Sequence, residues 1–195
     1  MNCNTKLAGK FVRQCGHRPK QGVAKKWYIN WEDIDFSATQ KANKGTKVTA
    51  LVLKSGTKIY PAETGANKGR KVKHALAAGD FGKGYIHTDE LVLTYVGENE
   101  SERIQELVDG ARVVTINKMV DNGENGEITY KIAGLESGME IINDDYDSSA
   151  NSGTTTLIVA TNEGEEESTR LKIWSEGSLS DTEGWINLHE YFGKG

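Results

Sequence analysis

The chain has 195 residues, of which 36% are hydrophobic and 27% charged, with a formal net charge of -4 at pH 7. This length suits one domain of ~100 to 200 residues. The longest apolar runs, 48–53 and 157–160, are far shorter than the ~20 residues that cross a bilayer. The composition therefore excludes a membrane-spanning protein, and we expect no membrane partner.

Charge is divided unevenly along the chain. Residues 1–75 carry 16 Lys and Arg and four carboxylates, a net charge of +12, whereas residues 76–195 carry eight Lys and Arg and 24 carboxylates, a net charge of -16. Such charges either interleave on one folded surface or meet between copies. The second interpretation predicts a head-to-tail contact, which closes into a ring or continues as a filament. It makes the cations of the basic part candidate subunit-interface residues: Lys6, Lys10, Arg13, Arg18, Lys20, Lys25, Lys26, Lys68, Arg70, Lys71 and Lys73.

The same basic part has the residue types that bind nucleic acid, with Trp27 and Trp31 available for base stacking. The acidic remainder repels phosphate, and the sequence has no helix-turn-helix, zinc-finger or aromatic RNA-binding motif. We therefore expect non-specific proximity to DNA at most.

The N-terminal residues give no sign of secretion or of a metal site. Cys3 and Cys15 are too few for a disulfide framework or a closed zinc site, so we interpret them as reduced thiols. Residues 1–10 hold two lysines and no apolar stretch, so we expect no secretory signal and synthesis in a cytoplasm.

Residues 1–46 are interpreted as a basic N-terminal arm with one aromatic strand. Trp27, Ile29 and Trp31 alternate with other residues, as in a strand with large side chains on one face. The flanks lack periodicity, which indicates an arm that is either disordered or ordered by a neighbouring subunit.

Residues 47–195 are interpreted as a β-sandwich or β-barrel domain. A hairpin is predicted from 48–53 and 58–60, because Ser-Gly forms the turn between two apolar runs. A loop with one helical turn is predicted over 64–84, followed by a strand over 85–96.

One α-helix is predicted, over 100–109. Asn99 is its expected N-cap, Glu102 completes a capping box, and Gly110 follows the C-terminus. Two Asn-Gly pairs predict a hairpin between 113–120 and 127–132. Further strands are expected at 154–160 and 170–174, and 185–192 is interpreted as a strand or a helical turn.

These elements predict a mainly β fold: a sandwich or barrel with one short central α-helix and an extended N-terminal arm. No βαβ alternation supports a parallel sheet. Phosphate-loop patterns fail in detail at 65–71 and 79–84, where the glycines are expected to form turns. A calcium-loop pattern fails at 143–149, where a solvated acidic loop is expected. We predict no catalytic residue, no metal and no cofactor, and we expect that the protein is not an enzyme.

Several segments within 65–146 resemble virion structural proteins of tailed phages, of the type that infect Bacteroides hosts: 73–76, 84–87, 104–110, 113–117, 130–135 and 138–141. The order of strands, helix and strands also resembles the tail-tube family, whose β-barrel with one flanking helix stacks as rings.

The resemblance implies a virion subunit, made in the host cytoplasm, that forms homo-oligomers as a tail tube or a tail or connector ring through which DNA passes. Other virion proteins are then partners. The long basic start departs from the tail-tube pattern and leaves a capsid-decorating role open. A second hypothesis is a monomeric β-sandwich module for carbohydrate binding or adhesion, which uses exposed tryptophans as sugar platforms: Trp27, Trp31, Trp174 or Trp185.

Overall fold

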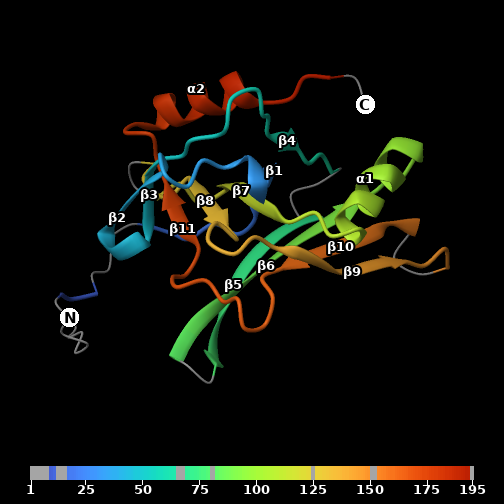
Figure 1. The fold of residues 1–195 in the computed structure, drawn as a ribbon, viewed down its shortest axis with the longest axis horizontal. Coiled ribbons are helices and arrows are strands. Elements are labelled where there is room, and N and C mark those ends of the chain that lie inside the picture. Colours follow the sequence, from blue (N-terminus) through green and yellow to red (C-terminus); the bar gives the residue numbers. More distant parts are fainter. Residues whose placement is uncertain are drawn as a thin grey trace.

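A computed structural model of the chain describes residues 9–11, 17–64, 69–79, 82–123, 126–149 and 153–193. Two β-sheets and two α-helices make up its fold, so the predicted mainly β, sandwich-like architecture is confirmed (Figure 1). The helix count differs from the prediction, because α2 (Leu179–His189) follows the last strand.

The larger sheet has seven strands, in the order β2 (Gln40–Ala42), β3 (Lys47–Ala50), β11 (Lys172–Trp174), β8 (Tyr130–Ala133), β7 (Val113–Met119), β1 (Val23–Asn30) and β4 (Tyr60–Pro61). The smaller sheet has four, in the order β5 (Arg70–Gly79), β6 (Gly82–Leu93), β10 (Thr155–Ala160) and β9 (Glu140–Tyr146). All pairs are antiparallel except β3 with β11. In Figure 1 the larger sheet lies between α2 and the smaller sheet.

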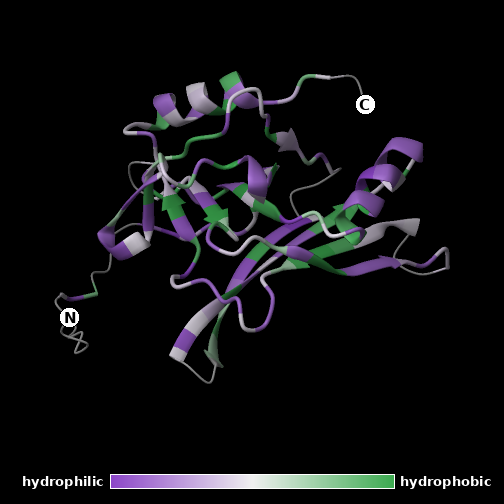
Figure 2. Cartoon of the chain, in the orientation of Figure 1, coloured by the Kyte–Doolittle hydropathy of each residue, from purple (hydrophilic) through white to green (hydrophobic). Residues whose placement is uncertain are grey.

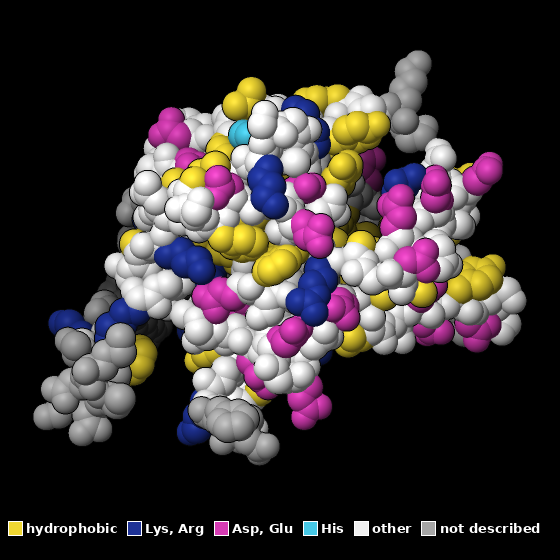
Figure 3. All heavy atoms as spheres, viewed as in Figure 1, with side chains coloured by type: hydrophobic (Ala, Val, Ile, Leu, Met, Phe, Trp, Pro, Cys, Tyr) yellow, Lys and Arg dark blue, Asp and Glu magenta, His cyan; other side chains and the backbone are white. Residues whose placement is uncertain are grey.

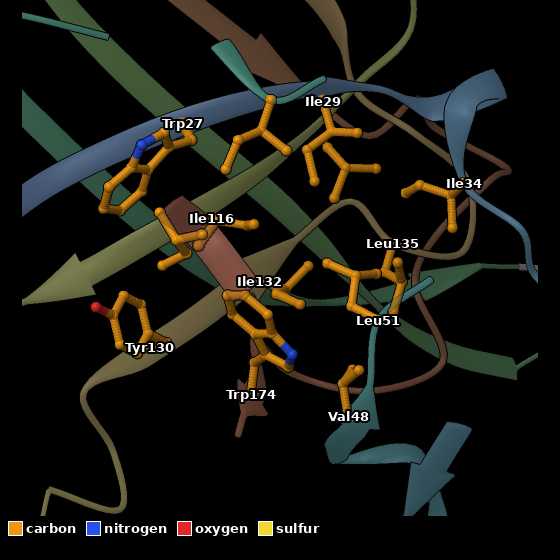
Figure 4. Packing of buried hydrophobic residues seen from close by; sticks show 13 residues of the cluster. Trp27, Ile29, Ile34, Val48, Leu51, Ile116, Tyr130, Ile132, Leu135 and Trp174 are labelled. Carbon is orange, nitrogen blue, oxygen red and sulfur yellow. The ribbon is translucent and has the colours of Figure 1, made fainter. Parts of the chain in front are cut away.

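The apolar core lies mainly on the α2 side of the larger sheet. Trp27 and Ile29 of β1 point to this side because successive strand residues alternate between faces, and both are buried. They join Trp174 and Ile186 in a cluster of 13 buried residues, much of which is shown in Figure 4. The alternate β1 residue, Lys26, points instead toward the smaller sheet.

The predicted boundary at residue 46 does not separate two units. β1 belongs to the supposed arm, yet it lies inside the larger sheet between β7 and β4. β2 and β3 pair with each other across that boundary. Two buried aromatic and aliphatic side chains, Trp27 and Ile29, give β1 enough apolar surface to join the core rather than extend away from it.

Three further expectations are corrected. The predicted 48–60 hairpin does not form, because β3 pairs with β2 and β11 whereas β4 pairs with β1. The predicted loop over 64–84 contains most of the β5–β6 hairpin. The predicted acidic loop at 143–149 begins as the exposed end of β9.

The first helix and the second predicted hairpin are present. α1 (Glu98–Val108) begins two residues earlier than expected, because the Gly97 N–H donates to the Glu100 carboxylate at 2.8 Å. β7 and β8 pair as the Asn-Gly pattern predicts. Figure 2 shows α1 as largely hydrophilic, whereas the strands of both sheets carry hydrophobic as well as hydrophilic stretches.

Candidate assembly surface

A buried ion pair joins the two sheets. Lys26 of β1 contacts Asp89 of β6, and both side chains are fully buried. Asp89 also accepts hydrogen bonds from Thr115 at 2.8 Å and from Asn117 at 3.2 Å, both on β7. Burial lowers the pKa of the Lys26 amine and raises the pKa of the Asp89 carboxyl, whereas their contact favours the charged form of each. Because Lys26 belongs to the basic part and Asp89 to the acidic part, this contact satisfies both charges within one chain.

A second buried polar cluster lies beside the first and surrounds His87. Burial lowers the pKa of His87 to about 4, so the ring is neutral near pH 7. The Gly134 N–H donates to Nδ1 at 3.0 Å, which leaves the proton on Nε2 to be donated to the Thr169 carbonyl at 3.0 Å. Nearby, Lys172 of β11 contacts Glu167 at 2.9 Å, and both are fully buried.

The structure distributes the predicted interface cations unevenly. Three of them lie outside the described residues: Lys6, Arg13 and Lys68. Six are exposed: Lys10, Arg18, Lys20, Lys25, Lys71 and Lys73.

Lys26 and Arg70 are corrections to the prediction, because both are buried within their own chain. Arg70 donates to the backbone carbonyls of Ala62 at 3.2 Å, Ala24 at 3.1 Å and Thr64 at 3.5 Å. Neither cation is free to contact another subunit.

Contacts between the basic and acidic parts also occur outside the core. Lys71 contacts Glu90 at 2.6 Å, Lys41 contacts Glu136 at 3.5 Å, and His17 lies 3.3 Å from Asp121. The charge division along the sequence is therefore partly neutralised by the fold itself. Whether an exposed charge can contact another copy therefore depends on where it lies on the surface.

The smaller sheet has two edges of opposite charge. β5 and β9 are its outer strands, and within the described part of the chain each pairs with a neighbour on one side only. β5 has Arg, Lys and His residues and no carboxylate, whereas β9 has three carboxylates and no Lys or Arg. An unpaired strand edge offers N–H and C=O groups to another strand.

Charged residues of both edges share the outer face of this sheet. The register places Lys71 opposite Glu90, which adjoins Asp89 and therefore points away from the larger sheet. Asn143 lies in the same row, across Ile158. Lys73 and Asp145 lie two residues further along their strands, on this face.

The outer half of the β5–β6 hairpin extends beyond the larger sheet (Figure 1). Near its base the cross-strand pairs are Val72 with Asp89 and His74 with His87, which pack inward. The next pair on this inward face is Leu76 with Tyr85. Leu76 is 61% exposed. The hairpin thus carries an uncovered apolar residue on the same strand that forms the basic edge.

The tryptophans do not form an exposed sugar platform. Trp27 and Trp174 are 3% and 1% exposed, and Trp31 and Trp185 are half-buried against the core. Within the described ranges, no three His, Cys, Asp or Glu side chains gather as metal ligands. No helix in that part of the chain is long and apolar enough to span a bilayer.

Comparison of the chain with protein-family models, with curated protein sequences and with solved structures found no match.

Proposed function

We propose that this protein is a structural subunit of a tailed-phage virion that assembles head to tail into a ring or tube through the two edges of its smaller sheet. The opposite charge of the β5 and β9 edges carries the assembly proposal. The virion assignment depends on the sequence resemblance described above.

The sheet order supports a continuous junction between copies. Strand directions alternate across β5, β6, β10 and β9, so the two edge strands run in opposite directions. When β9 of one copy meets β5 of a copy in the same orientation, the new pair is antiparallel and continues the sheet. The contact uses two different surfaces and is therefore heterologous, which leads to rings or filaments.

The same junction brings opposite charges together. Lys73 on β5 and Asp145 on β9 are exposed on the outer face, and opposite charges on adjacent strands each contribute roughly 0.2 to 1 kcal/mol. Backbone hydrogen bonds supply the affinity and these charges supply the choice of partner edge.

A charge-swap experiment tests this proposal. Variant A carries Lys73→Glu and Ala75→Glu, which place two carboxylates on the outer face of the β5 edge and leave the Lys71 contact with Glu90 intact. Variant B carries Asn143→Lys and Asp145→Lys, which place two cations on the outer face of the β9 edge. In each variant the substituted edge loses its charge complement on the other edge, so each alone should remain monomeric, whereas their equimolar mixture should assemble by contact between the two substituted edges.

Light scattering after size-exclusion chromatography and negative-stain images provide the measurement. Asn187→Glu and Asn187→Lys place the same charges on the exposed face of α2 and should leave assembly unchanged. Wild-type protein that stays monomeric at high concentration, or variants that assemble alone as well as together, would contradict the proposal.

A further inference from the structure

A groove lies between α1 and the adjoining end of the smaller sheet, with a volume of ≈ 560 Å³. Four large side chains line it and remain exposed to water: Tyr95 at 75%, Val96 at 36%, Val108 at 52% and Tyr146 at 63%. Ile104 of α1 also lines the groove and is buried. Polar residues share the lining, among them Ser101, Gln105 and Asp144. Exposed apolar side chains that gather in one groove mark a candidate interaction site.

Carboxylates surround this groove. α1 contains four glutamates and one cation, Arg103, which contacts Glu102 and Glu106 at 2.6 Å. β9 contributes Asp144, which lines the groove itself, whereas Glu140 of β9 pairs with Arg112 at 2.8 Å. Figure 3 shows acidic side chains gathered over α1 and this end of the smaller sheet. The chemistry fits an apolar segment flanked by cations.

Residues 1–16 of this chain have that composition. They contain three cations and no carboxylate, and the first acidic residue of the chain is Glu32. Apolar residues directly adjoin the cations, in the sequences Lys6-Leu7 and Lys10-Phe11-Val12-Arg13. Phe11 is 93% exposed, which is unusual for a large aromatic side chain in a folded protein.

Phe11 lies far from the groove of its own copy. Residues 9–11, the short dark-blue piece of Figure 1, and α1 lie at opposite ends of the molecule's longest axis. His17 contacts Asp121, which follows β7, whereas α1 lies near the start of β7 at Val113.

We propose that residues 1–16 of one copy bind in the groove between α1 and β9 of a neighbouring copy. Phe11 packs on the apolar lining, and the flanking cations face the carboxylates of α1 and β9. The inference depends on the proposed assembly, because it needs a neighbour whose groove lies within reach. Together with the strand-edge contact it joins each pair of neighbours twice, which raises the effective concentration of both contacts.

Photo-crosslinking from position 11 tests the inference in the full chain. Copies with Phe11→p-benzoylphenylalanine are mixed with 15N-labelled wild-type copies, irradiated after assembly, and digested for mass spectrometry. Crosslinks should join position 11 to labelled peptides that contain Tyr95, Val108 or Tyr146. Crosslinks that stay within one chain, or that reach another surface of the neighbour, would overturn the inference.

A pair of matched variants adds a second measurement. Val108→Glu places a charge in the groove on α1, whereas Leu188→Glu places the same charge on α2, where Leu188 is 70% exposed. Introduced into the labelled copies, Val108→Glu should lower the crosslink yield at least tenfold and Leu188→Glu should leave it unchanged. Equal yields in the two variants would overturn the inference.

The result separates this inference from the proposed function. If the wild-type protein forms multimers that the edge variants do not form, yet shows no crosslink to the groove, the proposed function is supported and the N-terminal contact is refuted. Monomers at every concentration refute both proposals.

Discussion

The larger sheet packs with α2 and adjoining segments around one cluster of 13 buried residues, whereas the smaller sheet meets the larger one largely through polar side chains. At that junction Asp89 and His87 of β6 are fully buried, and each makes several hydrogen bonds. A smaller apolar cluster, which includes Met139 and Val159, also lies between the two sheets. Apolar burial is therefore concentrated in one sheet, whereas the other has, within the described residues, two edge strands with a neighbour on one side only and a protruding hairpin.

The largest expected effect comes from the centre of the apolar cluster. Trp174→Ala removes a side chain that is 1% exposed and should lower the free energy of unfolding by about 3 to 5 kcal/mol. Leu76→Ala, on the protruding hairpin, should change it by less than ~0.5 kcal/mol. Chemical denaturation of both variants measures the difference. Similar losses at the two positions would break the comparison between the sheets.

The next effect concerns the ion pair between the sheets. Asp89→Asn leaves the buried amine of Lys26 without its carboxylate and should cost about 3 kcal/mol. The double variant Lys26→Met with Asp89→Leu removes both charges and should be more stable than Asp89→Asn, because no unpaired charge remains. Denaturation curves measure both, and a double variant that is the less stable of the two would show that the charges themselves hold the sheets together.

The smallest of the three effects is a pH dependence from His87. Its pKa is about 4 in the folded protein against 6.5 as the reference value, so the unfolded chain binds more protons between these values. Stability therefore rises with pH over this window, and a fall from pH 6.5 to 5 should cost about 2 kcal/mol. His87→Asn keeps an acceptor near the position of Nδ1 and does not titrate. The free energy of unfolding of this variant should therefore fall less than that of the wild type over the same pH interval.

The chosen window avoids a second group. Burial would raise the pKa of Glu136, but hydrogen bonds from Ser168 and Lys172 outweigh burial and lower it to about 2. Its stabilising contribution is lost only below the reference value of 4.5. Equal pH slopes for wild type and His87→Asn between pH 5 and 6.5 would contradict the role assigned to His87.

Local patterns predicted the elements whose signal lies within a few residues. The alternation of Trp27 and Ile29 indicated β1, and the Asn-Gly pairs indicated the β7–β8 hairpin. β5 was missed because its exposed lysines and alanines give little apolar alternation. α2 was missed because Gly184 lies inside it and few of its residues are buried.

Long-range partners were beyond the reach of those patterns. Nothing near β3 in the sequence indicates that it pairs with β11, more than 120 residues later. Likewise, composition revealed that the halves of the chain differ in charge, but not that Lys26 and Asp89 meet inside one molecule. The signal for the candidate assembly surface was present in the lysines of β5 and the carboxylates of β9, yet only the sheet order shows that they form opposite edges.

The place of β11 in the larger sheet has a consequence for biosynthesis. β11 is the last strand to leave the ribosome, yet it lies between β3 and β8 and carries Trp174 into the core. The β5–β6 hairpin, by contrast, needs only local contacts and can form as soon as it emerges. A nascent chain thus displays the β5 edge before its interior is complete, and translation speed relative to the concentration of nascent chains becomes a determinant of whether they aggregate.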